Sequence, residues 1–333
     1  MARFIGDSGS NNLFGTRRSD VILGLGGEDT LFGNGGADKI SGFGSIRGGG
    51  GRDKFSLVGV DHEQETLLSQ TNIAMGGGAD QVVINTHDTT TDDGSVLHGG
   101  IYLDGGNDSF LVSGRLGATV YLGEGSDTLI AMSQNIGSYP GLDTFAGEQT
   151  VQPDAGSDTF ISDGHSTFFI RGFGQNDVLE IYDTEIQSVQ ELRQHSAYEP
   201  NTSTTNLKIT LTNGSYIVIY KAWDGFLSAS NIRLHSETLQ VKREVFIGND
   251  KTPTEVIFAS GADDSLISRG DTIFLGNGND RGIGTKHDDT FRGERGDDTL
   301  LGKGVLSDVE ILGSAACSGH WRSLRHQRQT EYS

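Results

Sequence analysis

The feature that most constrains the fold is a nine-residue repeat that runs without a gap from Gly6. The first four units read GDSGSNNLF, GTRRSDVIL, GLGGEDTLF and GNGGADKIS, and each of them begins with glycine. The sixth place holds Asn11 in the first unit and Asp20, Asp29 and Asp38 in the next three, while the eighth place is a large apolar residue. A short fixed period predicts stacked repeats, in which each unit buries its apolar side against its neighbours.

The same unit returns near the other end of the chain as GTKHDDTFR and GERGDDTLL, with Asp289 and Asp298 in the sixth place. The preceding segment LGNGNDRGI carries Asp280 in the same frame, although Gly282 stands where an apolar residue is expected. We assign Asp263, in the sequence GADDS, to the same set. The recurrence predicts a second, shorter block of stacked repeats.

The repeat predicts where its aspartates lie. Glycine adopts positive φ at little cost, so the first half of each unit can turn sharply before a short strand follows. Two units then form one coil, so Asp20 and Asp38 lie on the same edge of coils stacked about 4.8 Å apart. Carboxylates this close repel each other, and one calcium ion, with oxygen ligands at ~2.3–2.6 Å, fits between them. The alternative is a row of solvated aspartates, which turns favour in any case.

These units resemble the RTX, or hemolysin-type, nonapeptide G-G-x-G-x-D-x-U-x, in which U is a large apolar residue. The resemblance implies that the ion is Ca²⁺ and that the chain holds several ions. It also implies that turn glycines take part in the sites beside the aspartates; the glycines concerned are Gly24, Gly26, Gly33 and Gly35.

Between residues 42 and 181 the nine-residue frame is lost, but glycine turns followed by aspartate persist between apolar strands. The aspartates of these turns are Asp53, Asp80, Asp108, Asp127, Asp158 and Asp177. The pattern predicts a right-handed parallel β-solenoid with one calcium-binding edge. A parallel β-helix of the polysaccharide-active type is the competing architecture, because it stacks its coils similarly without needing Gly-x-Asp turns.

The next segment differs in character and predicts a cap. Ser188–Ala197 is expected to form a short helix, with Ser188 as its N-cap and Glu191 completing a capping box. Further on, apolar and polar residues alternate on both sides of Asn213-Gly214, which predicts a β-hairpin. A solenoid needs such a cap to cover its last apolar coil and its exposed strand edge. The run from residue 172 through this hairpin resembles the segment that closes the β-roll of serralysin-type secreted proteins.

The predicted fold class is therefore all-β, a parallel β-roll or β-solenoid with a small α+β cap. We expect the chain to divide into five parts. These are an RTX β-roll over 1–56, a looser solenoid over 57–181, a helix-plus-hairpin cap over 182–245, a second short roll over 246–310 and a disordered tail over 311–333.

Charge and composition limit the classes of partner that the chain is expected to bind. Lys and Arg total 25 against 45 Asp and Glu, a net charge of −20, which disfavours nucleic acid because phosphates require a basic surface. No run approaches the ~20 apolar residues of a membrane span. The N-terminus has no apolar stretch typical of a signal peptide, so we expect an extracellular protein exported without one. Cys317 is the only cysteine, so no intrachain disulfide can form.

The sequence contains no recognisable catalytic motif. His62-Glu63 would begin a zinc-protease motif, but Thr66 stands where its second histidine belongs. We therefore expect a non-enzymatic module that binds calcium ions, folds on binding them and has a structural, adhesive or secretion-supporting role. The alternative is a lyase or epimerase of the β-helix type that carries RTX modules, with Tyr102 and Tyr121 as candidate site residues. Cell-surface or extracellular polysaccharide would then be the partner.

Overall fold

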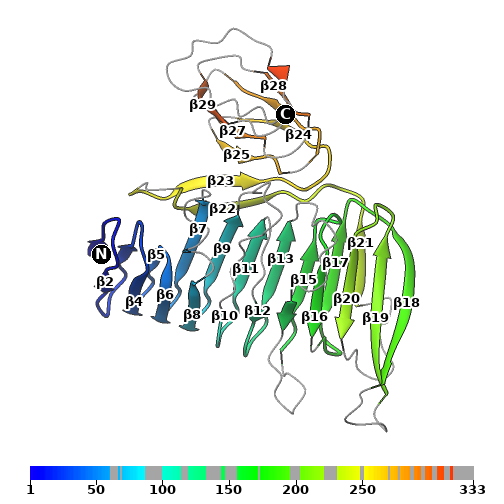
Figure 1. Ribbon diagram of the computed structural model, residues 1–333, viewed down its shortest axis with the longest axis horizontal. Coiled ribbons are helices and arrows are strands. Elements are labelled where there is room, and N and C mark those ends of the chain that lie inside the picture. Colours follow the sequence, from blue (N-terminus) through cyan, green and yellow to red (C-terminus); the bar gives the residue numbers. More distant parts are fainter. Residues whose placement is uncertain are drawn as a thin grey trace.

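The computed structural model describes most of the chain. The described residues are 1–60, 67, 70–86, 100–113, 119–132, 144–146, 156–171, 173–195, 203–220, 231–247, 251–268, 271–276, 278–285, 289–293, 297–301, 306–310 and 316–317. Within them, successive strands alternate between two facing sheets, so that each pair of strands forms one coil of a solenoid (Figure 1). The prediction of an all-β parallel solenoid is confirmed.

The first sheet, sheet A, takes every second strand of the solenoid. Its described strands, in spatial order, are β1 (Arg3–Ile5), β3 (Val21–Leu23), β5 (Lys39–Ser41), β7 (Lys54–Val60), β9 (Gln81–Thr86), β11 (Ser109–Ser113), β13 (Thr128–Met132), β15 (Thr159–Ser162), β17 (Val178–Tyr182) and β21 (Ile232–His235). All neighbours in this sheet are parallel, as in the pairing of Val21 with Lys39. Paired residues such as these are two nine-residue units apart, so the strand register has the period that the repeat predicts.

The second sheet, sheet B, faces sheet A across the core. Its described strands are β2 (Asn12–Phe14), β4 (Asp29–Gly35), β6 (Gly44–Gly50), β8 (Asn72–Gly77), β10 (Gly100–Tyr102), β12 (Thr119–Tyr121), β14 (Thr144–Ala146), β16 (Phe168–Arg171), β20 (Tyr216–Tyr220), β19 (Ser203–Leu211) and β18 (Ile186–His195). The strands from β2 to β20 are parallel, and the last pairings, β20 with β19 and β19 with β18, are antiparallel.

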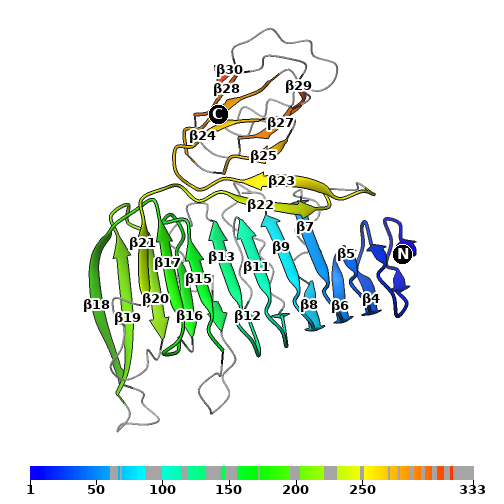
Figure 2. The same ribbon diagram turned by 180° about the vertical axis from the view of Figure 1, so that it is seen from behind.

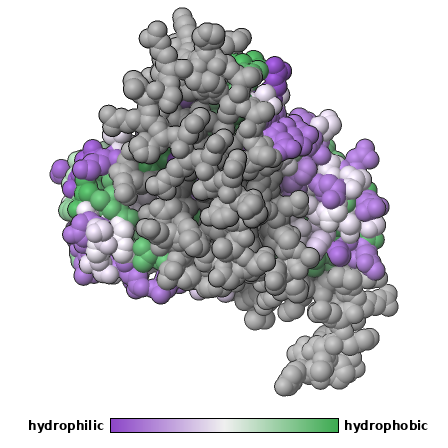
Figure 3. All heavy atoms as spheres, turned by 45° about the horizontal axis from the view of Figure 1, so that its top comes forward, coloured by the Kyte–Doolittle hydropathy of each residue, from purple (hydrophilic) through white to green (hydrophobic). Residues whose placement is uncertain are grey.

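The core is a narrow stack of apolar side chains between the two sheets. The eighth-place residues Ile22, Leu31 and Ile40 are fully buried in it. Farther along, Phe110 pairs with Leu129 in the next coil, so each apolar residue packs on the one above and the one below. The described surface in Figure 3 is mixed, with hydrophilic residues beside hydrophobic ones on both flanks of the molecule.

The expected helix over Ser188–Ala197 is wrong, because residues 188–195 lie in a long strand, β18, which begins at Ile186. Residues 196–197 lie outside the described residues. The capping-box pattern is a local signal, and it loses to pairing with β19, which supplies hydrogen-bond partners along the strand. The expected hairpin around Asn213-Gly214 is confirmed, since β19 and β20 pair antiparallel across it and Gly214 has a φ of 93°. The resemblance of this region to a serralysin closing segment is not confirmed.

A second block follows, built from two further sheets. Sheet C contains β22 (Val241–Val245), β23 (Thr254–Phe258), β25 (Thr272–Phe274), β27 (Asp289–Arg292) and β29 (Leu306–Glu310). Sheet D contains β24 (Ser265–Ile267), β26 (Arg281–Ile283), β28 (Thr299–Leu301) and β30 (Ala316–Cys317). Except for the antiparallel pair β22 and β23, the described neighbours are parallel and repeat the two-strand coil. The rest of the expected tail, residues 311–315 and 318–333, lies outside the described residues.

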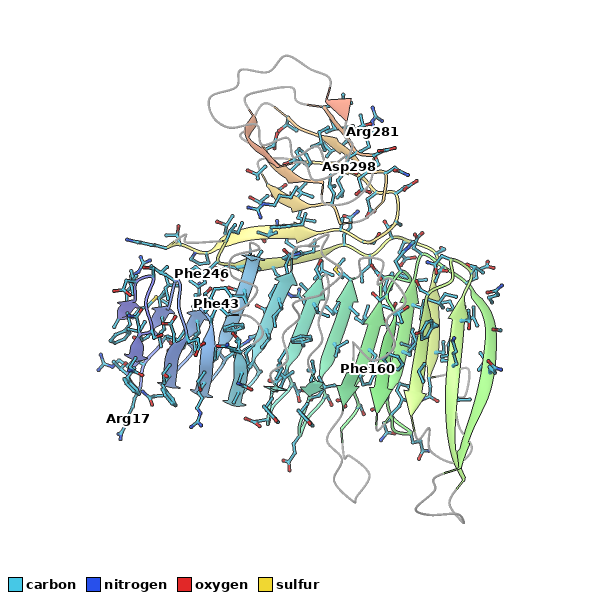
Figure 4. All side chains as sticks on the ribbon, in the orientation of Figure 1. Arg17, Phe43, Phe160, Phe246, Arg281 and Asp298 are labelled. Carbon is cyan, nitrogen blue, oxygen red and sulfur yellow. The ribbon has the colours of Figure 1, made fainter. Side chains whose placement is uncertain are left out.

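The second block docks on the outer face of sheet A, where β22 and β23 lie across its strands (Figure 2). Val83 and Leu111 of sheet A join Val256 and Phe258 of β23 in one buried apolar cluster. Polar contacts surround this cluster, and Glu244 of β22 pairs with two lysines of sheet A, on β5 and β7. Figure 4 marks Phe43 and Phe160 in the solenoid and Phe246 at its boundary with the second block.

We expect the stacked core to control stability. Replacing Phe110, which is fully buried between coils, with alanine should lower the free energy of unfolding by about 3–5 kcal/mol. The matched control is Phe14→Ala, because Phe14 is 55% exposed on the outer face of sheet B and its loss should cost much less. Urea unfolding in saturating calcium, followed by circular dichroism, measures both changes. Equal losses for the two variants would contradict the proposed packing.

Candidate metal centres

The turns that lead from sheet B into sheet A lie along the edge of the solenoid away from the second block, at the bottom of Figure 1. Each turn ends in a buried aspartate that immediately precedes a sheet A strand. We call this row of side chains the carboxylate column. Its members are Asp20, Asp38, Asp53, Asp80, Asp108, Asp127, Asp158 and Asp177.

The column is held together by a continuous chain of hydrogen bonds. The backbone N–H of Asp20 donates to Oδ1 of Asp38 at 2.7 Å, and the N–H of Asp38 donates to Oδ1 of Asp53 at 2.8 Å. The same bond continues from coil to coil as far as Asp177, which accepts from the N–H of Asp158 at 3.0 Å. One carboxylate oxygen of each residue is thereby fixed in place, and the direction of the other is fixed with it.

The second carboxylate oxygen is the unusual one. In four of these eight turns Oδ2 is buried and has no hydrogen-bond partner among the described residues. This holds in the column for Asp38, Asp53, Asp80 and Asp108. A buried polar atom without a partner costs on the order of 1–3 kcal/mol, and more when it carries charge. Repetition of the same deficit on successive coils indicates a missing ligand that supplies positive charge.

Burial also disfavours the charged form of these carboxylates. Removal from water raises the pKa of Asp38 to about 6, and it raises the pKa of both Asp80 and Asp108 to about 7. Repulsion between neighbours adds to the effect, as Asp53 and Asp20 do for Asp38. A cation placed beside Oδ2 would reverse both effects, because it stabilises the ionised form.

The backbone of the turns leaves room for a ligand beside Oδ2. The first residue of several turns is glycine, and a Cβ there would collide with the carboxylate that closes the turn. Gly24 stands in this relation to Asp29, and Gly33 stands in it to Asp38. The glycines in the third place of a turn have another role, which is to link successive coils. The N–H of Gly35 donates to the carbonyl of Thr16 in the preceding coil at 3.2 Å.

The fourth place needs glycine for two reasons. At Gly78 and Gly106 φ is 144° and 143°, a region that L side chains rarely adopt. A Cβ at Gly78 would also overlap the carbonyl oxygen of Gly51, the fourth residue of the preceding turn. Successive turns therefore stack backbone on backbone. A Cβ at Gly33 would collide with both Oδ2 of Asp38 and the carbonyl oxygen of Gly48 in the next coil, so these two oxygens lie near the same point.

Two further sets of predicted residues lie apart from this column. Asp29 lies on the opposite edge, where its Oδ1 accepts from the N–H of Asn11 at 2.9 Å. In the second block the N–H of Asp280 donates to Oδ1 of Asp298 at 3.0 Å, while Asp289 lies in a turn on the other edge of that block. The Oδ2 atoms of Asp29, Asp280 and Asp298 are buried without a partner among the described residues. Removal from water raises the pKa of Asp280 to about 9.

The assignment of Asp263 is corrected by the structure. Asp263 is exposed, and the residue aligned with Asp280 and Asp298 is its neighbour Asp264, which is buried and donates its N–H to Oδ1 of Asp280 at 2.7 Å. The nine-residue frame, counted from Ala259, would have found it, because it places Asp264 sixth.

A second residue that sequence reasoning missed is Asp104. It has a φ of 69° and lies close enough to raise the pKa of both Asp80 and Asp108 by charge repulsion. Its place is second in the turn rather than sixth, and the repeat pattern gave no reason to choose an acidic residue there.

The donor set fits a hard, oxygen-seeking cation. Among the described residues, no group of three or more His, Cys, Asp or Glu side chains is placed to hold a metal ion. Each site would therefore depend on carboxylate oxygens of the column together with backbone carbonyl oxygens of the glycine turns. Calcium accepts carboxylate and carbonyl ligands in flexible geometry, whereas magnesium demands a near-ideal octahedron. When bound, calcium would supply the positive charge that the buried carboxylates lack.

Comparison with known families agrees with this chemistry. Residues 5–40 and 274–304 match the family described as RTX calcium-binding nonapeptide repeat. These segments are RTX calcium-binding repeats. The first match contains Asp20, Asp29 and Asp38, and the second contains Asp280, Asp289 and Asp298. No curated protein has a significantly similar sequence. No described helix is both long enough and apolar enough to cross a membrane.

The raised pKa values predict an unusual pH dependence for the calcium-free protein. A carboxyl whose pKa is higher in the folded state stabilises the fold when protonated, and the contribution is lost as pH rises through the folded pKa. For Asp80 and Asp108 that loss is centred at about pH 7. The melting temperature in calcium-free buffer should therefore rise when the pH is lowered from about 8 to about 5.5.

The matched control is the double variant Asp80→Asn/Asp108→Asn. It keeps the Oδ1 acceptors of the hydrogen-bond chain but cannot titrate, so its melting temperature should respond less to pH. Thermal unfolding followed by circular dichroism provides the comparison. A calcium-free wild-type protein that melts at lower temperature in mild acid would contradict the assignment of these carboxyls as buried and ion-free.

Proposed function

We propose that this chain is a secreted calcium-binding solenoid whose repeats fold when calcium fills the carboxylate column. The proposal depends chiefly on one observation, the recurrence of buried Oδ2 atoms that have no partner among the described residues. The ligands proposed are Asp29, Asp38, Asp53, Asp80, Asp108, Asp127, Asp158, Asp280 and Asp298, and the turn glycines Gly24, Gly26, Gly33 and Gly35 contribute backbone oxygens. The predicted ligands Asp20, Asp177 and Asp289, like Asp264, already accept a hydrogen bond on Oδ2 within their own turns. Asp263 is excluded from the set.

Ion binding and folding are linked in this proposal. The unfolded chain has no preformed site, so the free energy of ion binding adds to the stability of the fold. Extracellular calcium modules have dissociation constants of about 10⁻⁴–10⁻³ M, which suffices outside a cell but not at cytosolic calcium levels. The net charge of −20 keeps the ion-free chain expanded through self-repulsion. An expanded chain suits export through a narrow channel.

Outside the cell we propose a structural or adhesive role without catalysis. Proteins with RTX repeats are typically secreted, and the RTX repeat itself is a structural calcium-binding element. We further propose that the chain consists of the five parts expected from the sequence, with boundaries near residues 56, 181, 245 and 310.

A second candidate partner is extracellular polysaccharide. The observation in its favour is the pair Tyr102 and Tyr121 on the outer face of sheet B, whose rings stack at 4.7 Å with Tyr102 42% exposed. Flat exposed rings pack well against sugar rings. If polysaccharide is the partner, the calcium-loaded protein should migrate more slowly in gels that contain alginate or pectin, and Tyr102→Ala should abolish this retardation. Release of uronate from these polymers would instead support the enzymatic alternative.

Calcium-driven folding is tested on the wild-type chain. Circular dichroism should show a β-sheet spectrum in millimolar calcium, a weaker β-sheet spectrum with a lower melting temperature in EDTA, and full recovery on recalcification. Magnesium at the same concentration is the control and should not restore the spectrum, because it dehydrates reluctantly and requires near-ideal octahedral geometry. A β spectrum that persists unchanged in excess chelator at neutral pH would overturn the proposal.

A further inference from the structure

The glycine turns of this protein fall into two classes that differ in the second place. In the turn 15–20 the second residue is Thr16, whose N–H and Oγ1 both donate to Oδ2 of Asp20 at 2.7 Å. In the turn 259–264 the second residue is Ser260, whose N–H and Oγ both donate to Oδ2 of Asp264 at 2.9 Å. We call these closed turns, because the protein itself satisfies the carboxylate oxygen that would face an ion.

Two more turns are closed by the same kind of bond. The N–H of Thr285, again a second-place threonine, donates to Oδ2 of Asp289 at 2.7 Å. In the turn that ends at Asp177 the donor is the third residue, and the N–H of Gly174 donates to Oδ2 of Asp177 at 2.6 Å. In each closed turn the Oδ2 atom already has a donor within the turn, so an ion would have to displace it.

The remaining turns, which we call open turns, have a different backbone. Their second residue is left-handed even where it is not glycine, with φ of 74° at Leu25, 72° at Asn34 and 69° at Asp104. A left-handed leucine costs roughly 1–2 kcal/mol, so the conformation needs a compensating gain. Their fourth residue is a left-handed glycine as well, as at Gly36 with φ of 101°. Closed turns have Arg18 or Ala262 there, and neither has positive φ.

The classes also differ in their position in the stack. The closed turn 15–20 begins the carboxylate column, and the closed turn 172–177 ends it. Beyond that end, Asn231 takes the place of an aspartate and donates its Nδ2 to the carbonyl of Asp177 at 2.8 Å. The closed turn 259–264 begins the second block, where the N–H of Gly261 donates to Asp163 of the solenoid at 3.1 Å. Three of the four closed turns therefore lie at boundaries, where an ion would lack a neighbouring turn. The fourth, which ends at Asp289, leads into β27, and β27 lies between β25 and β29 of sheet C.

The electrostatics of the two classes point in opposite directions. Hydrogen bonds from Thr16 and from the N–H of Ala2 hold the pKa of Asp20 below its usual range. Burial raises the pKa of Asp38, which occupies the same place one coil later, to about 6. In the closed turn hydrogen bonds favour the ionised carboxylate, whereas in the open turn burial disfavours it.

We infer that the second and fourth places decide which turns take calcium, so that closed turns are calcium-independent caps and only open turns load. This inference rests on the proposed calcium function and refines it. It removes Asp20, Asp177, Asp264 and Asp289 from the set of ion ligands on their own turns. Among the turns whose second and fourth residues the structure describes, it leaves ion uptake to the open turns 24–29, 33–38, 48–53, 75–80, 103–108, 122–127 and 275–280.

A pair of single substitutions tests the inference. Asp38→Asn should lower the number of calcium ions bound per chain, because it removes the charge of an open turn. It should also leave the calcium-free protein as stable as before or more stable, since a buried charge is gone. Asp20→Asn should leave the ion count unchanged and lower the melting temperature by the same amount with and without calcium, because it disrupts only the bonds from Thr16.

Ion counts come from equilibrium dialysis followed by elemental analysis, and melting temperatures come from circular dichroism. Equal losses of calcium in Asp20→Asn and Asp38→Asn would overturn the inference while leaving the proposed function intact. A wild-type chain that binds no calcium would instead overturn the proposed function itself.

A gain-of-site variant provides an independent test. Thr16→Gly/Arg18→Gly gives the turn 15–20 the backbone freedom of an open turn and removes the hydroxyl donor, so the folded variant should bind about one more calcium ion. Thr16→Gly/Arg17→Gly is the matched control, because it has the same composition but leaves the fourth place occupied; Arg17 itself points away from the coil (Figure 4). An equal ion count in the two folded double variants would contradict the role of the fourth place.

Discussion

The structure depends on carboxylates that are buried at the edge of each coil with only one oxygen satisfied. Oδ1 is needed to hold the coils in register, because it accepts the N–H of the preceding aspartate. That bond forces Oδ2 into the turn, where water is excluded and the described residues offer no donor to Asp53 or Asp80. The same side chain thus stabilises stacking and creates a local need for positive charge. A divalent cation meets that need without changing the backbone.

This arrangement explains how a thin core can suffice. Each coil contributes only a few buried apolar side chains, and hydrophobic residues are 34% of the chain. A stack of short parallel strands of this kind is marginal without an added source of stability, and intrachain disulfides are impossible with one cysteine. Ions along one edge would supply that stability in proportion to the number of coils. Closed turns and the β18–β19–β20 extension would protect the ends, where a coil has one neighbour.

Much of the fold follows from the repeat. The frame that relates Asp20 to Asp38 predicts two strands per coil and aspartates on one edge, and both appear in the structure. The frame is lost beyond residue 42 because the turn before Gly44 is shortened, so that Asp53 follows Asp38 after 15 residues. From there on, the six-residue turn is kept on the edge that carries the carboxylate column.

Other features required the coordinates. The strand at Ile186–His195 carries a local helix signal that pairing with β19 overrides. Asp263 and Asp264 are adjacent acids, and the hydrogen bond from Asp264 to Asp280 shows which of them continues the row. The difference between closed and open turns depends on φ at the second place and on a hydroxyl hydrogen bond, neither of which composition reveals.

The most direct test of the central claim is anomalous X-ray scattering from crystals grown in calcium. The account predicts calcium peaks beside Oδ2 of Asp53 and Asp80, and ordered water at those atoms in calcium-saturated crystals would contradict it.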